Sequence, residues 1–243
     1  MSFRGHRGKE KQTRSGPVVV VELGHRTAPA SQTLVALHGM NVTTVWDRVA
    51  PLLASGKPPM RVILPKPRSN PETAPVMSEL AVARYALTLG GWLPRPIRES
   101  YLLDLLPKDG PIALAGMSWG GGAAARFAAA YPERVSRLVL ISPDVEYSVV
   151  KQLNPNMPIL LIWARDDKLN PYTWSRKFKG HPKLTMHTDE YGGHTVLDSH
   201  ADIIWHWLAT PDDELPCETR SVEHGISAWM PWYAGSVLPS LRG

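Results

Sequence analysis

A serine in a glycine-rich turn is the residue of this chain best placed to act as a nucleophile. Residues 112–117 form an apolar stretch of strand length. Its last two residues begin the motif Gly116-Met117-Ser118-Trp119-Gly120. An alanine-rich helical stretch, residues 123–131, follows directly. A strand, a tight turn and a helix in this order are what a nucleophile elbow requires, because the turn lifts the hydroxyl of Ser118 above the strand end. Gly116 and Gly120 fit such a turn because side chains at both points would collide.

A nucleophilic serine also needs a base, an acid that orients the base, and N–H donors for the oxyanion. Asp166 and Asp167 follow an apolar run, and His194 follows two glycines shortly before the last helical pattern. Each group has an ordinary structural alternative. His194 could be a satisfied loop histidine, and Asp167 could cap the segment that begins at Pro171. The residues by themselves leave open which of the two carboxylates is the acid.

The elements that must position these groups alternate along the chain. Short apolar runs predict strands at 18–23, 33–37, 61–64, 112–117, 137–142, 158–163 and 183–187. Helical patterns lie at 76–89, 98–106, 123–131, 171–178 and 196–208. Near-continuous apolar strands that alternate with helices predict an α/β fold, with a mostly parallel central sheet covered by helices on both faces.

With these motifs in this order, the chain resembles the α/β-hydrolase superfamily from about residue 30 to 208. Its elbow resembles the family's Gly-x-Ser-x-Gly, His38-Gly39 resembles the oxyanion loop, and Gly193-His194 resembles the catalytic-histidine loop. The family's acid loop usually reads Gly-x-x-Asp, with a proline a few residues later. Aligned with residues 164–167 and Pro171, this pattern selects Asp167, although Ala164 stands in place of the usual glycine.

The resemblance implies a serine hydrolase that cleaves a carboxylic ester or thioester, a small-molecule acyl substrate, without cofactor or metal. His194 would take the proton of Ser118, and Asp167 would fix the imidazole tautomer. The backbone N–H of Trp119 and, by the resemblance, that of Met40 would form the oxyanion hole. Two alternatives stay open: an amide or peptide hydrolase with the same three residues, and a non-catalytic binding protein on this fold.

The substrate pocket is less well defined by the sequence. About 16 residues lie between Ser142 and the next strand at Ile159, which leaves no room there for a helical lid. We therefore expect an open site, unless residues 65–107 or the C-terminal extension cover it. Trp46 and Trp119 are candidate walls of an apolar acyl pocket, with core packing as the alternative role for Trp46.

Composition limits the class of protein. Of the 243 residues, 43% are hydrophobic and 20% charged, which fits one globular α/β domain, expected at 17–210. The single cysteine, Cys217, excludes an internal disulfide. We expect no secretory signal and no membrane span, because no apolar run is long enough. These features predict a cytoplasmic protein, with an organelle address in the basic N-terminus left open.

The two ends of the chain differ from its middle. Residues 1–16 hold five basic side chains and predict a disordered tail, which carries most of the net charge of +5. This tail lacks interleaved aromatics, so nucleic-acid binding is not expected. Residues 211–243 form an extension with several aromatic side chains. Such a segment is expected to pack on the domain or on a partner subunit, which leaves a homo-oligomer open.

Overall fold

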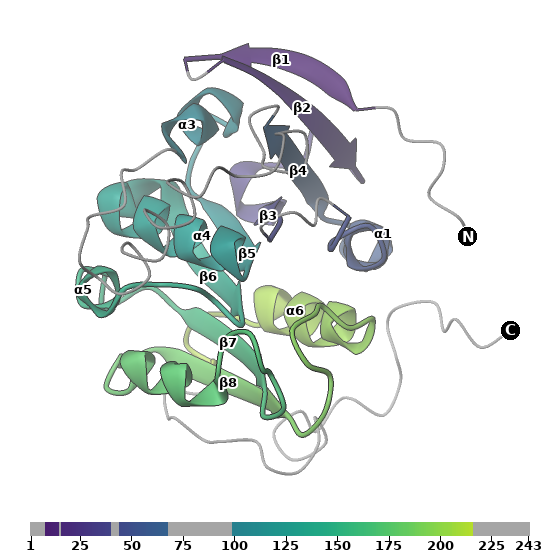
Figure 1. Ribbon diagram of the computed structural model, residues 1–243. Coiled ribbons are helices and arrows are strands. Elements are labelled where there is room, and N and C mark those ends of the chain that lie inside the picture. Colours follow the sequence, from purple (N-terminus) through teal and green to yellow (C-terminus); the bar gives the residue numbers. More distant parts are fainter. Residues whose placement is uncertain (1–7, 15, 40–43, 68–98, 216–243) are drawn as a thin grey trace, which may run out of the picture.

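Eight strands form one sheet in the order β1-β2-β4-β3-β5-β6-β7-β8 (Figure 1). The computed structural model of the protein describes residues 8–14, 16–39, 44–67 and 99–215. The strands span Lys9–Thr13 (β1), Gly16–Leu23 (β2), Thr33–Leu37 (β3), Arg61–Pro67 (β4), Ile112–Met117 (β5), Val135–Ile141 (β6), Ile159–Ala164 (β7) and Leu184–Asp189 (β8). Strands β3 to β8 are parallel, and β2 pairs antiparallel with both β1 and β4. The predicted α/β fold with a mostly parallel sheet is confirmed.

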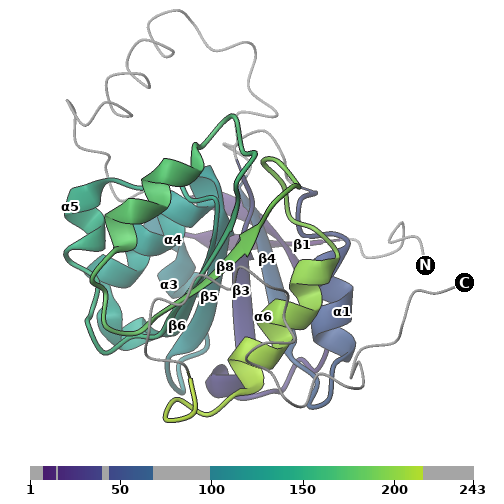
Figure 2. The same ribbon diagram turned by 90° about the horizontal axis from the view of Figure 1, so that it is seen from below.

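Helices cover both faces of the sheet, as Figure 2 shows. One face carries α1 (Val49–Ser55) and α6 (Ser199–Ala209). The opposite face carries α3 (Leu102–Leu105), α4 (Trp119–Ala130) and α5 (Tyr147–Val150). Short 3₁₀ turns complete the described elements at Ala30–Gln32 (η1), Glu99–Tyr101 (η2), Pro132–Arg134 (η3) and Tyr172–Phe178 (η4).

The strands are buried on both faces, which explains their continuous apolar sequences. In β7, Ile159, Leu161 and Trp163 face the core beneath α4, whereas Leu160 and Ile162 face the core beneath α1 and α6. Successive side chains of a strand point to opposite faces, so a strand between two helical layers needs apolar residues at every position. Because β3 to β8 run parallel, the loops at their carboxyl ends all lie at one edge of the sheet.

The N-terminal segment differs from the expected disordered tail. Lys9–Thr13 form β1, which pairs along its length with β2, and Arg14 makes an ion pair with Asp104 at 2.8 Å. The backbone of an edge strand pairs regardless of side chain, and charged residues are common on such strands because they discourage further pairing. The polar sequence of β1 therefore carries no apolar pattern by which it could be recognised. Residues 1–7 lie outside the described part of the chain.

Several helices expected from the sequence begin or end at different residues in the structure. Segment 171–178 forms the 3₁₀ helix η4, segment 98–106 is divided between η2 and α3, and the closing helix starts at Ser199. The helix expected at 76–89 lies outside the described residues, and so do residues 216–243 of the aromatic extension. Within the described residues, no helix is long and apolar enough to cross a membrane.

Candidate active site

Ser118 lies between β5 and α4 in a strained backbone conformation, with φ 55° and ψ −123°. Such a conformation costs about 1–3 kcal/mol in a non-glycine residue and persists only where the surroundings enforce it. A Cβ atom on Gly116 would lie 2.2 Å from the Gly120 carbonyl oxygen, and one on Gly120 would lie 2.3 Å from the His38 carbonyl oxygen. Both glycines of the elbow are therefore required by close backbone approach.

Backbone hydrogen bonds hold the elbow against the neighbouring strand. The N–H of Ser118 donates to the Ile141 carbonyl at 2.9 Å. The carbonyl of Ser118 accepts from the N–H groups of Gly122 at 3.1 Å and Asp144 at 2.9 Å. These bonds tie the turn to the end of β6 and offset the strain at Ser118.

The side chains of Asp167 and His194 are joined by a hydrogen bond. His194 Nδ1–H donates to Asp167 Oδ2 at 2.8 Å, and the Asp167 side chain is fully buried. The other carboxylate oxygen accepts the N–H groups of Leu169 and Asn170, both at 2.9 Å. Both oxygens of the buried carboxylate are thus satisfied, as burial of a charged group demands. Because Nδ1 donates, Nε2 of the neutral imidazole is the nitrogen that can accept a proton.

The two neighbouring aspartates have different partners. Asp166 is exposed, and its carboxylate accepts the backbone N–H of Gly193 at 2.8 Å and that of Gly192 at 3.4 Å. It is Asp167, the residue selected by the family pattern, that reaches the imidazole of His194. Asp167 also closes a local turn through Leu169 and Asn170, but it does not cap the segment that begins at Pro171, because the N-terminus of η4 has no side-chain capping bond.

Ser118 and His194 both lie at the carboxyl edge of the sheet, where β5 and β8 end. Among the described residues, no hydrogen bond joins Ser118 Oγ to His194. Contacts between a nucleophile and its base are often long without substrate and tighten in the Michaelis complex. The His194 side chain is 12% exposed, so the imidazole is held by its surroundings yet reachable from solvent.

The first turn of α4 presents N–H groups beside Ser118. Trp119 opens this helix, and N–H groups of a first helical turn have no partner within the helix. His38 lies next to it: its ring stacks on Trp119 at 6.5 Å between centroids, and its Nδ1–H donates to the Gly39 carbonyl at 2.7 Å. The predicted second donor, Met40, lies outside the described residues, so its role stays a prediction.

The described contacts of Trp46 are those of a core residue. Its side chain is 1% exposed, packs in the core beneath α1 and α6, and donates its indole N–H to the Leu37 carbonyl at 2.9 Å. These contacts fit the core-packing alternative for Trp46, and its role as a wall of an acyl pocket stays a prediction. Trp119 is partly exposed beside Ser118, and its role as a pocket wall stays a prediction.

The connection between β6 and β7 carries no large insertion. It contains only α5, Tyr147–Val150, as its helical element. A second link crosses this region: Asn170 Nδ2 donates to the carbonyl of Ser142 at 2.7 Å, and Ser142 has a positive φ of 42°. The loop that holds Asp167 is therefore fastened to the end of β6. Asn170 belongs to no sequence pattern by which this contact could be predicted.

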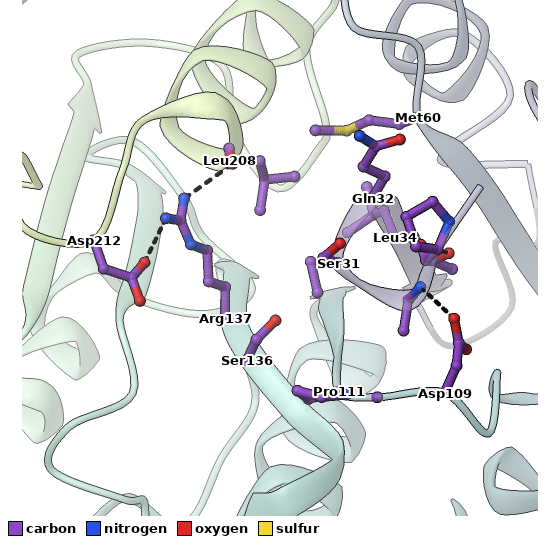
Figure 3. Close-up of a pocket in the computed structure, with 15 residues that line it drawn as sticks. Ser31, Gln32, Leu34, Met60, Asp109, Pro111, Ser136, Arg137, Leu208 and Asp212 are labelled. Carbon is purple, nitrogen blue, oxygen red and sulfur yellow. Dashed lines mark hydrogen bonds and ion pairs between the residues drawn. The ribbon is translucent and has the colours of Figure 1, made fainter.

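A cavity of about 580 Å³ lies at the opposite edge of the sheet, near the starts of β3, β5 and β6 (Figure 3). Its basic residue, Arg137, donates to the carbonyls of Trp207, Leu208 and Thr210 and pairs with Asp212. The lining residues include neither histidine nor cysteine. This cavity therefore lacks a histidine or cysteine that could act as base or thiol nucleophile. Within the described ranges, no cluster of side chains suits a metal ion.

Comparison with known proteins agrees with the geometry. The sequence profile of the family described as alpha/beta hydrolase fold matches residues 33–153. A putative lipase from Acinetobacter baumannii is similar in structure with a TM-score of 0.61 and 17% identity, covering 84% of this chain and 90% of the lipase. A thioesterase domain from the curacin biosynthetic pathway gives a TM-score of 0.60 and 15% identity over 85% of this chain and 100% of that domain.

A meta-cleavage product hydrolase from Pseudomonas fluorescens gives a TM-score of 0.59 and 15% identity, covering 82% of this chain and 95% of the hydrolase. At such identities a structural likeness shows the fold alone. Together with the sheet order and the family match, these likenesses define the class: the chain is an α/β-hydrolase-fold protein. The resemblance drawn from the sequence is thereby confirmed.

Proposed function

We propose that this protein is a serine hydrolase that cleaves a carboxylic ester or thioester through an acyl-enzyme on Ser118. The observation that carries the proposal is the 2.8 Å bond from His194 to the buried Asp167, at the same sheet edge as the strained elbow. A histidine on a buried carboxylate beside an elbow serine has the parts for acyl transfer.

In the proposed mechanism, His194 Nε2 takes the proton of Ser118 Oγ as this oxygen attacks the acyl carbon. Asp167 keeps the proton of the neutral imidazole on Nδ1 and stabilises the imidazolium that forms. The oxyanion accepts hydrogen bonds from the N–H of Trp119 and, by prediction, of Met40. His194 then protonates the leaving oxygen or sulfur, and a water activated by the same imidazole releases the acid and restores Ser118.

Esters and thioesters are favoured over amides because their leaving groups need less assistance, and the described residues between β6 and β7 place no cap over the elbow. Two proteins of similar structure are described as a putative lipase and a thioesterase domain, which are names for enzymes that cleave esters and thioesters. A cytoplasmic location and a small-molecule substrate stay predictions.

The test compares the parent protein with Ser118→Ala, using a fluorophosphonate probe and p-nitrophenyl esters from acetate to long chain. We expect the parent to be labelled and to hydrolyse at least one ester. Removal of the nucleophile from such a triad lowers kcat by about 10⁶-fold, and labelling should vanish. A well-folded parent that is neither labelled nor active would contradict the proposal and favour the binding-protein alternative. Cleavage of aminoacyl p-nitroanilides in preference to esters would favour the amide hydrolase.

A further inference from the structure

The loop that carries His194 joins β8 to α6 and spans residues 190–198, called here the His194 loop. It contains Gly192 and Gly193, with φ values of 147° and 61°. Glycines in the left-handed region give a loop great conformational freedom once its restraints are lost. A catalytic imidazole, however, has to be held within a fraction of an ångström of its working position. Groups outside the loop must therefore hold it.

The first restraint acts at the two glycines. Asp166 accepts the N–H of Gly193 at 2.8 Å and of Gly192 at 3.4 Å, so a carboxylate fastens the backbone directly before His194. The neighbouring residues repeat this pattern: Arg165 pairs with Glu190 at 2.9 Å, and Asp167 bonds to the imidazole itself. Three consecutive residues after β7 thus contact four residues of the His194 loop.

The second restraint acts at the base of the loop. Asp189, the last residue of β8, accepts from His200 Nε2 at 2.9 Å and from His187 Nε2 at 3.1 Å. His200 lies in the first turn of α6, is 2% exposed, and accepts the N–H of Leu197 at its Nδ1 at 3.1 Å. Because Nδ1 accepts, Nε2 carries the proton that is donated to Asp189. One hydrogen-bonded chain therefore joins the start of the loop to its end.

The charge of Asp189 agrees with this role. Burial of the carboxyl by itself raises its pKa, but hydrogen bonds from His187 and His200 outweigh burial and hold the pKa below its usual range. Two imidazoles and a carboxylate can also ligate metals. Here both Nε2 atoms are directed at the carboxylate oxygens, and none of the described residues form a group suited to a metal ion. The cluster is therefore a structural one.

We propose that Asp166 and the Asp189–His200 pair are positioning residues: they hold the His194 loop so that the imidazole stays on Asp167. None of the three touches the substrate in this proposal. Its catalytic consequence rests on the proposed function, since it assumes that His194 is the base. The restraint on the His194–Asp167 hydrogen bond is a geometric claim and does not depend on the proposed function.

The test uses the full chain with Asp166→Ala and His200→Ala, measured on the p-nitrophenyl ester that the parent hydrolyses fastest. Misplacement of a catalytic group by about 1 Å can cost 10²-fold, so we expect kcat to fall about 5- to 20-fold for the exposed Asp166 and about 10- to 100-fold for His200. KM should stay within about twofold, because neither residue binds substrate. Asp166→Asn and His200→Gln each keep one hydrogen-bonding group in place and should recover most of kcat.

Matched controls separate positioning from general destabilisation. Asp213→Ala removes an exposed carboxylate far from the loop, and His206→Ala removes a histidine that is 4% exposed on the same helix as His200. The second control should lower the unfolding midpoint much as His200→Ala does. Both controls should keep the parent kcat.

A readout without catalysis completes the test. The downfield proton resonance of the His194–Asp167 hydrogen bond, assigned by its loss in Asp167→Ala, should broaden or vanish in Asp166→Ala and His200→Ala but persist in Ser118→Ala. A resonance that stays as sharp in both alanine variants as in the parent would overturn the proposal. The proposal is also overturned if both variants of an active parent keep its kcat. If the parent is inactive but the resonance behaves as expected, the proposed function fails while the positioning of His194 stands.

Discussion

The two edges of the central sheet differ in what they offer to chemistry. At the carboxyl edge, Ser118 stands in a strained turn and Asp167 and His194 are hydrogen-bonded to each other. At the amino edge lies a cavity of about 580 Å³ whose basic residue, Arg137, is occupied by three backbone carbonyls and Asp212 (Figure 3). This cavity therefore lies at the edge that holds neither Ser118 nor the Asp167–His194 pair.

Helix polarity explains this difference. In a strand–helix unit the helix begins at the carboxyl edge, so α4 directs its positive N-terminal end at Ser118, where an oxyanion would form. At the amino edge the carbonyl end of α6 arrives instead, and carbonyls attract a cation. Arg137 supplies that cation from within the chain. The N-terminal end of α4 thus offers a positive potential at the carboxyl edge. At the amino edge, Arg137 already satisfies the carbonyls at the end of α6.

The largest effect should come from breaking the pair at the carboxyl edge. Asp167→Asn keeps the size of the side chain but removes the charge and favours the wrong imidazole tautomer, so we expect kcat to fall by about 10³–10⁴-fold. Asp166→Asn, one residue away, should lose less than about fivefold, because it keeps an acceptor for the loop. Steady-state kinetics on one p-nitrophenyl ester measure both. Equal losses in the two variants would contradict the assignment of Asp167.

At the amino edge, Arg137→Met should affect stability and leave activity alone. The substitution leaves the carbonyls of Trp207, Leu208 and Thr210 without their donor, which should lower the free energy of unfolding by about 2–4 kcal/mol. Urea unfolding measures the loss, and kcat on the same ester should match the parent. A variant of unchanged stability with reduced kcat would show instead that the cavity takes part in the reaction.

Trp46→Phe tests whether this side chain belongs to the core or to the substrate pocket. The change removes the indole N–H that donates to Leu37 at 2.9 Å. We expect a loss of about 1–3 kcal/mol in the free energy of unfolding from the unpaired carbonyl and the smaller ring. If Trp46 acts only in the core, KM for long-chain esters should be unchanged, whereas a rise in KM confined to those esters would support its predicted place in the pocket.

The smallest effect should come from the ion pair that fastens β1 to the domain. A hydrogen bond from Arg14 lowers the pKa of Asp104 to about 2. A carboxyl whose pKa is lower in the folded state than its unfolded value of about 3.9 adds stability above that value and loses it as pH falls toward the folded pKa. The stability difference between the parent and Asp104→Asn, from urea unfolding, should therefore shrink between about pH 4 and pH 2. A difference that stays constant across this range would exclude a role for this carboxylate.

Much of the site could be predicted because its signals are local. The elbow combines an apolar strand, two glycines and a small-residue helix within residues 112–130, and steric contact requires each glycine. Strands buried on both faces, such as β5 and β7, stand out because every position is apolar. Patterns of this kind depend on residues close in the chain, so they can be recognised without a structure.

Other features depend on contacts between distant segments. Asp166 and Asp167 are both plausible acids in the sequence, and their roles separate only where the loop after β7 meets Gly193 and His194. In the folded loop the carboxylate of Asp167 is buried and that of Asp166 is exposed. Similarly, β1 forms because the edge of β2 offers it backbone partners, a condition that its own polar sequence does not reveal.

The sequence by itself therefore determined the α/β fold, the elbow at Ser118 and the order of serine, acid and histidine along the chain. Tertiary structure decided that Asp167 meets His194, that Trp46 packs in the core, and that Asp189 and His200 close the His194 loop. The reason is physical: apolar periodicity and backbone sterics act between near neighbours. A hydrogen bond across 27 residues exists only once the strands have been brought side by side.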